Sequence, residues 1–99
     1  MDIQIQSIHF TADVKLLDFV KEKVSKLSHF YDGIISSEIF LRLDNSDNLT
    51  NKIAEIKIQV PGNDLYVKRQ CKTFEEAIDK GTVALSKQVM RYKEKHKRE

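Results

Sequence analysis

Alternating apolar and polar residues mark four short stretches of the chain, at residues 3–6, 35–44, 54–60 and 65–71. A period of two is that of an extended strand, whose successive side chains point to opposite faces. We expect either a bulge or the end of the first stretch, IQIQ, near Ser7, because Ile8 and Phe10 fall on the parity opposite to the isoleucines before it. Each strand keeps one polar side, which predicts a sheet covered on one face only.

The three later strands have apolar sides that we expect to face a common core. Those sides consist of Ile35, Ile39, Leu41 and Leu43 in the first of the three, Ala54, Ile56, Ile58 and Val60 in the next, and Leu65, Val67 and Cys71 in the last. Polar residues at 44–51 and the PGND sequence at 61–64 predict turns, so these strands form a meander.

A three-to-four-residue apolar repeat predicts a helix over residues 13–32, packed through one face. Its apolar stripe consists of Leu17, Val20, Val24, Leu27 and Tyr31, with Leu16 beside it. Asp13 is the expected N-cap, because its carboxylate accepts hydrogen bonds from free backbone N–H groups of the first turn. We expect the helix to end at Asp32 and Gly33, since glycine accepts the left-handed conformation common past a helix end.

A second helix is predicted over residues 73–97. Its buried stripe consists of Phe74, Ile78, Leu85, Val89 and Tyr92. Thr73 and Glu76 form a capping box, in which each side chain accepts a hydrogen bond from the backbone N–H of the other residue. Glycine inside a helix costs roughly 1 kcal/mol relative to alanine. Gly81 therefore indicates a close approach of this helix to the sheet.

The elements follow the order β-α-β-β-β-α. The first helix crosses over and brings the second strand parallel to the first, with the right-handed connection that such crossovers adopt. We therefore predict an α+β fold of two layers, a four-stranded mixed sheet with two helices packed on one face. The chain of 99 residues is 40% hydrophobic and 32% charged, which is typical of one folded domain spanning 1–99.

The composition argues against several classes of protein. No apolar run approaches the ~18 residues of a membrane span, and MDIQIQ at the N-terminus is unlike a signal peptide. The single cysteine, Cys71, cannot form an internal disulfide, which fits a reducing cytoplasm. His9, His29 and His96 lack the spacing of zinc ligands, so we expect no metal or cofactor. Neither a nucleophile with its base nor a glycine-rich phosphate loop stands out, and we expect no catalytic residues and no small-molecule substrate.

Charge is unevenly divided along the chain. Residues 1–50 carry five Lys/Arg and eight Asp/Glu, a balance of −3, whereas residues 51–99 carry twelve and seven, a balance of +5. At about 100° per residue, one side of the second helix carries Lys80, Lys87, Arg91 and Arg98, with Lys95 nearby. The first helix places Lys15, Lys23 and Lys26 to one side of its buried stripe.

Two interpretations of this basic row stay open on spacing alone. It is either the solvated polar face that any amphipathic helix needs, or a surface that binds an anionic partner. Nucleic acid is the best-fitting partner, because a rigid helix sets cations against successive phosphates. A membrane fits least, because the apolar face is needed for the core. The exposed sheet side carries Tyr66 and Lys68 but lacks the aromatic pair on which readers of single-stranded RNA stack bases.

Two stretches carry a family resemblance that covers nearly the whole chain. LLDFVKEKVSKLSHFYDGI, at 16–34, is similar to a FVxxKxxKLxxFxD helix, and FEEAIDKGTVALSKQVMRYKEKHK, at 74–97, to an AIDxxxxxLxRQxxKxKxK helix. Both motifs are those of the ribosome hibernation-promoting factor family, which the chain resembles in these two stretches. That family includes protein Y and was once labelled a sigma-54 modulator. The resemblance implies a domain bound to the small ribosomal subunit near the decoding region, where it contacts ribosomal RNA and blocks messenger and transfer RNA. Because the sequence ends directly after the second helix, we expect from the resemblance a short-form member of the family.

The resemblance also implies which residues bind RNA. The matching positions are Lys23 and Lys26 on the first helix, and Lys87, Gln88, Arg91, Lys93, Lys95 and Lys97 on the second. Lys80 and Arg98 join this set because they share the basic side, whereas Ala84 stands where relatives often carry lysine. The function implied is that of a cytoplasmic, non-enzymatic inhibitor of translation in stress or stationary phase. The alternative is a protein-interaction module whose basic helix docks an acidic partner such as a transcription factor.

Overall fold

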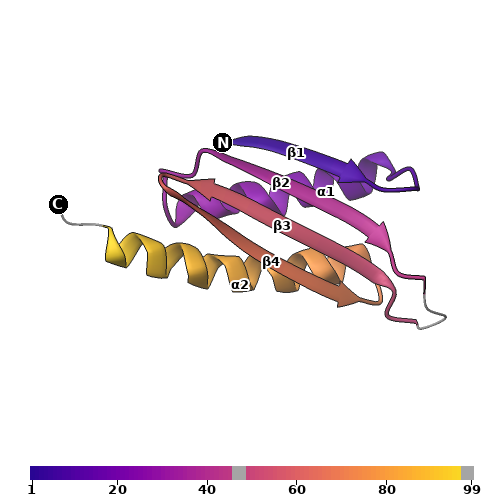
Figure 1. The fold of residues 1–99 in the computed structure, drawn as a ribbon. Helices are drawn as coiled ribbons and strands as arrows, with labels where there is room; N and C mark the ends of the chain where they lie inside the picture. Colours follow the sequence, from indigo (N-terminus) through magenta and orange to yellow (C-terminus); the bar gives the residue numbers. More distant parts are fainter. Residues whose placement is uncertain (46–48, 97–99) are drawn as a thin grey trace.

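The computed structural model describes residues 1–45 and 49–96, which form four strands and two α-helices (Figure 1). In chain order the elements are β1 (Asp2–Ser7), α1 (Val14–Ser25), a 3₁₀ helix η1 (Lys26–His29), β2 (Ser36–Leu43), β3 (Lys52–Val60), β4 (Asn63–Cys71) and α2 (Phe74–Lys95). This is the β-α-β-β-β-α order expected from the hydrophobic pattern, and β1 ends at Ser7 as the change of parity indicates.

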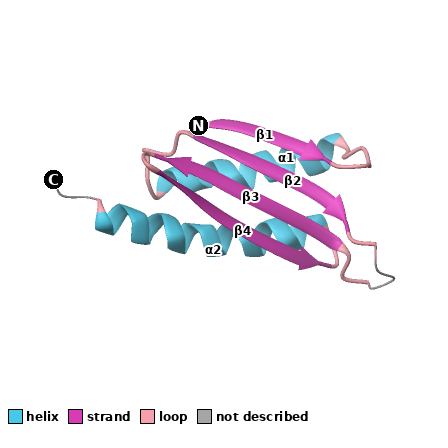
Figure 2. Ribbon diagram, in the orientation of Figure 1, coloured by secondary structure: helices cyan, strands magenta, loops and turns pink. Residues whose placement is uncertain are grey.

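The sheet has the strand order β1-β2-β3-β4. β1 pairs with β2 in parallel, and the other two pairings are antiparallel. Figure 2 shows both helices on the same face of the sheet, with the opposite face open. α2 packs on β3 and β4 and also contacts α1. The prediction of a two-layer α+β fold with a mixed sheet is therefore confirmed.

The core lies between the sheet and the two helices. Ile39 and Ile56 from the sheet and Ile78 and Leu85 from α2 are fully buried in one cluster. Gly81 brings α2 close to the sheet, since a Cβ at this position would lie 3.1 Å from the terminal methyl of Ile56. The close approach expected from a glycine inside a helix is thus confirmed.

Several positions expected in the core are exposed. Ile35 is 51% exposed and Leu43 is 45% exposed, because they lie just before and at the last residue of β2. Ile34 fills the core at the start of the strand instead, at 6% exposure. On α1, the buried stripe begins at Leu16, and Leu17 is only partly buried. Val20, Val24 and Leu27 are buried as expected, so the difference is confined to the first turn of the helix.

The first helix also ends earlier than expected. α1 gives way to η1 after Ser25, and Gly33 has no left-handed backbone; Gly62, with φ of 76°, is the glycine in that conformation. The reason for glycine at position 33 is steric. A Cβ there would lie 2.4 Å from the ring of Tyr31, so the aromatic side chain needs the space that glycine leaves.

Both helices begin at a side-chain cap. Asp13 accepts from the backbone N–H of Leu16 at 2.8 Å, and Thr73 accepts from the backbone N–H of Glu76 at 3.0 Å. The carboxylate of Glu76 lies 3.2 Å from the ammonium of Lys80. Only one of the two hydrogen bonds of the capping box is therefore present, the one that Thr73 accepts. The carboxylate of Glu76 pairs with Lys80 instead, one turn along the helix.

Candidate nucleic-acid interface

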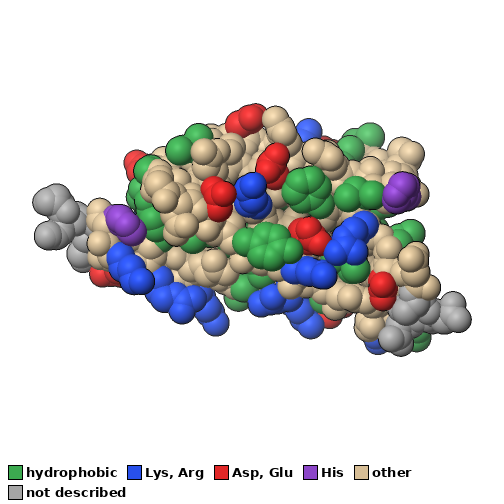
Figure 3. All heavy atoms as spheres, in the orientation of Figure 1, with side chains coloured by type: hydrophobic (Ala, Val, Ile, Leu, Met, Phe, Trp, Pro, Cys, Tyr) green, Lys and Arg blue, Asp and Glu red, His purple; other side chains and the backbone are tan. Residues whose placement is uncertain are grey.

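α2 has two exposed flanks, one facing the edge strand β4 and the other facing α1. The flank beside β4 carries the basic row of Lys80, Lys87, Arg91 and Lys95. Gln88 joins this flank to the strand, because its side-chain amide donates to the backbone carbonyl of Tyr66 at 3.1 Å. Figure 3 shows Lys and Arg side chains gathered along this edge of the molecule. The described members of the predicted row therefore lie on one flank of α2, next to β4.

A groove of about 850 Å³ lies between this flank and β4. Its cationic lining consists of Arg69, Lys80, Lys87 and Arg91. Val83 and Ala84 give it an apolar part. Arg91 also lines a second hollow of about 480 Å³, to which Lys95 contributes. Because Arg91 and Gln88 border both, the two hollows follow one another along the helix.

The remaining basic residues lie on the other flank. Lys23 and Lys26 border a smaller groove of about 190 Å³ between the helices, together with Phe30 and Val83. Lys93 lines a separate hollow, which Asp32 also borders. The structure thus divides the predicted RNA-binding residues over both flanks of α2. Lys97 and Arg98 lie outside the described residues.

The cations of the predicted set differ in whether a carboxylate lies within ion-pair distance. Among the described residues, three ion pairs engage members of the predicted set: Lys23 with Asp79 at 2.9 Å, Lys26 with Glu22 at 4.0 Å and Lys80 with Glu76 at 3.2 Å. Within residues 1–45 and 49–96, no acidic group lies within ion-pair distance of Lys87, Arg91 or Lys95. In the part of the chain that the structure describes, no carboxylate therefore competes with an anionic partner for these three cations.

The last turns of α2 are fixed by aromatic contacts. The Tyr92 ring is buried, its hydroxyl donates to the backbone carbonyl of Pro61, and it meets Tyr31 edge-on at 5.6 Å between centroids. Burial, with a smaller contribution from Tyr31, raises the pKa of the Tyr92 phenol. The His96 ring stacks on Tyr92 at 4.1 Å. Arg91 and Lys95 are thereby held on a helix end that is anchored to the turn after β3.

The chain matches the model of one protein family over residues 3–97, which is described as sigma 54 modulation protein / S30EA ribosomal protein. The chain belongs to this family. The match covers all the strands and helices of the described structure except Asp2, the first residue of β1, so the residues of the basic flank lie within the matched region. The resemblance of the two helical stretches to this family is confirmed.

Individual relatives agree with this assignment. A ribosome hibernation promoting factor of Pseudomonas putida is 25% identical over 95 residues, which cover 96% of this chain and 89% of the relative. The crystal structure of the Thermus thermophilus protein Y N-terminal domain superposes with a TM-score of 0.81 at 25% identity, covering 93% of this chain and 99% of that one. A ribosomal subunit interface protein from Coxiella burnetii has the same fold, with a TM-score of 0.82 at 19% identity and coverage of 94% and 98%.

Arg69 is a groove residue that the sequence pattern did not single out. In β4 it occupies a position on the side of the strand that faces the helices, between the buried residues Val67 and Cys71. Its own side chain is nevertheless exposed. β4 is an edge strand, so a long side chain on this parity reaches solvent beside the helix. A charged residue at an inward position of an edge strand is the signal that would have identified it.

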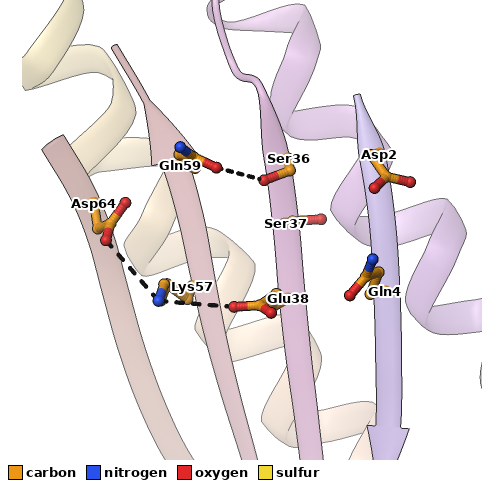
Figure 4. A pocket seen from close by; sticks show the side chains of 8 residues that line it. All are labelled: Asp2, Gln4, Ser36, Ser37, Glu38, Lys57, Gln59 and Asp64. Carbon is orange, nitrogen blue, oxygen red and sulfur yellow. Dashed lines mark hydrogen bonds and ion pairs between the residues drawn. The ribbon is translucent and has the colours of Figure 1, made fainter. Parts of the chain in front are cut away.

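The open face of the sheet differs from the helical side. Figure 4 shows a polar hollow on this face, where Lys57 lies 3.7 Å from Glu38 and 4.0 Å from Asp64. Phe40 lies on this face in addition to Tyr66, so the face carries two aromatic rings. The register places the two rings in different rows, with β3 between them. They do not form one stacking platform.

The described part of the chain offers little for other chemistry. None of its His, Cys, Asp and Glu side chains form a group of three or more that is placed to hold a metal ion. None of its helices is both long and apolar enough to cross a membrane. Cys71 is buried and unpaired, as expected from its parity in β4. The exposed cations of α2 are therefore the main chemical feature of the surface.

Proposed function

We propose that this chain is a ribosome hibernation factor whose single domain, residues 1–99, binds the small ribosomal subunit near the decoding region. Lys and Arg side chains of the helical side contact ribosomal RNA phosphates, and the bound domain excludes messenger and transfer RNA from the space it occupies. Inhibition is steric and requires no catalysis. The protein acts in the cytoplasm, in stress or stationary phase.

One observation carries this proposal: Lys87, Arg91 and Lys95 form a row without acidic partners in the described chain, on a domain that belongs to this ribosomal protein family. The P. putida relative is named a hibernation promoting factor, and the C. burnetii neighbour a subunit interface protein. A rigid helix with unpaired cations suits contact with successive phosphates, which position a protein without reading sequence. Shape and charge therefore supply the binding energy.

The test is a double variant with a matched control. Lys87→Ala with Arg91→Ala removes two charges from the basic row, and neither side chain belongs to the core. Lys21→Ala with Lys68→Ala removes the same charge from exposed positions on α1 and on the open sheet face. We expect the first pair to weaken binding to purified small ribosomal subunits on the order of a hundredfold at low salt, and the control pair much less.

Two results would count against the proposal. If both double variants bound like the unaltered protein, the row would not be the interface. If binding to a cell extract survived complete nuclease digestion and followed one acidic protein, the domain would be a protein-interaction module.

A further inference from the structure

We infer that the groove between β4 and α2 is a binding site for an RNA backbone, in which Arg69 holds a phosphate on the strand side opposite Lys87 and Arg91. This inference rests on the proposed function and adds to it a second wall of the interface, supplied by the sheet. An RNA strand in this open groove would contact both β4 and α2, whereas a helix alone would contact it from one side.

The position of Arg69 follows from the fold. Its inward neighbours on β4, Val67 and Cys71, are buried beneath α2 at 5% and 6% exposure, whereas Arg69 is exposed. The strand is at the edge of the sheet, so the guanidinium leaves the core sideways and lines the groove. An arginine that had only to solvate the edge could lie on the open face, as Lys68 does.

The described surroundings of the Arg69 guanidinium supply no carboxylate partner. Among residues 1–45 and 49–96 it forms no ion pair, and one of its nitrogens donates to the backbone carbonyl of Lys68 at 2.8 Å. Arginine has five N–H donors in a planar fork that matches phosphate geometry. One donor fixes the side chain against its own strand, and the others remain for a ligand.

The lining of the groove suits a phosphodiester chain. It contains four cations and one acidic residue, Asp79, whose carboxylate is already 2.9 Å from Lys23. Val83, which is 58% exposed, and Ala84 supply apolar surface between the cations. A nucleic-acid backbone alternates anionic phosphates with less polar sugars, so both kinds of lining find a counterpart.

The experiment compares neighbouring residues on one strand. Arg69→Gln and Lys68→Gln each remove one charge, but from opposite sides of the sheet, and Arg69→Lys keeps the charge. Affinity for purified small ribosomal subunits is measured for each at several salt concentrations. We expect Arg69→Gln to weaken binding on the order of tenfold and to lower the salt slope by about one phosphate contact. Lys68→Gln should change neither, and Arg69→Lys should keep the slope while losing part of the affinity.

The outcomes separate this inference from the function on which it rests. If the unaltered protein bound the subunits but Arg69→Gln left the affinity and its salt dependence unchanged, the groove assignment would be wrong. The proposed function would not be affected. Equal losses for Arg69→Gln and Lys68→Gln would overturn it too, because net charge would explain them. If binding persisted after nuclease digestion, the ligand of the groove would be a protein and not RNA. If the unaltered protein did not bind at all, both would fail. A thermal unfolding curve for each variant confirms that it is folded.

Discussion

The ammonium of Lys23 on α1 lies 2.9 Å from the carboxylate of Asp79 on α2, so an ion pair joins the two helices on the exposed side of the domain. Both residues border the groove between the helices, and Asp79 also lines the groove beside β4. The pair places a negative charge among the cations that the proposed function assigns to RNA. Asp79 therefore reduces the positive field on both flanks of α2.

Asp79→Asn should strengthen ribosome binding, because it removes this charge and frees Lys23. We expect roughly two- to fivefold tighter binding at low salt, with a free energy of unfolding changed by less than about 1 kcal/mol, as is usual for exposed pairs. Asp18→Asn, at an exposed position of α1, is the matched control. Tighter binding by both variants to the same degree would show a net-charge effect. Weaker binding by Asp79→Asn would show that the pair positions Lys23.

Gly33→Ala should destabilise the domain through Tyr31. The new Cβ would lie 2.4 Å from the tyrosine ring, which must move and disturb its edge-on contact with Tyr92. Overpacking of this kind costs about 1–3 kcal/mol. Urea unfolding should show this loss in the unaltered background and little further loss in a Tyr31→Ala background.

Gly62→Ala, measured in the same two backgrounds, is the matched control for Gly33→Ala. Nothing lies within 4 Å of a Cβ at position 62, but the backbone has φ of 76°, which disfavours any residue with a side chain. Its cost should be about 1–2 kcal/mol and should be the same with or without Tyr31. If the cost of Gly33→Ala were equally independent of Tyr31, the steric explanation of Gly33 would be wrong.

Tyr92 should make the stability of the domain sensitive to alkaline pH. Burial raises its pKa above the ordinary value of 10.0, so the unfolded chain loses the phenol proton at lower pH than the folded chain does. The stability that Tyr92 contributes is thus complete below pH about 10 and falls as the pH rises above it. Tyr31 and His96 are the titratable groups in contact with the ring.

The check is urea unfolding of the unaltered protein and Tyr92→Phe from pH 8 to pH 11. Tyr92→Phe should be less stable at pH 8, because the Pro61 carbonyl loses its donor. The difference in free energy of unfolding between the two proteins should decrease above pH 10. A gap that stayed constant or widened would show that the folded state does not hold the phenol neutral.

The fold was largely predictable because each element depends on local periodicity. Strand alternation and helical repeats identified all four strands and both α-helices, and the side-chain caps at Asp13 and Thr73 marked both helix starts. Periodicity is weakest where adjacent residues are both apolar. Leu16 and Leu17, and Ile34 and Ile35, are such pairs, and only packing against the rest of the fold decides which member is buried.

The candidate site was predictable only in part, because it depends on contacts between distant residues. The basic row of α2 follows from helical spacing. The pairing of Lys23 with Asp79 does not, since the two are far apart in the chain and meet only when the helices pack. Arg69 likewise joins the row only because β4 lies beside α2 at the edge of the sheet. The steric role of Gly33 also requires the position of the Tyr31 ring.

The central claim is that unpaired cations hold this domain to ribosomal RNA, and co-sedimentation with isolated small ribosomal subunits tests it most directly. The protein should pellet with the subunits at about 50 mM salt and be released near 200 mM. About four phosphate contacts, one each for Arg69, Lys87, Arg91 and Lys95, imply an affinity loss on the order of a hundredfold over that range. Protein that remained in the supernatant at the lower salt concentration would contradict the claim, as would protein that stayed bound at the higher one.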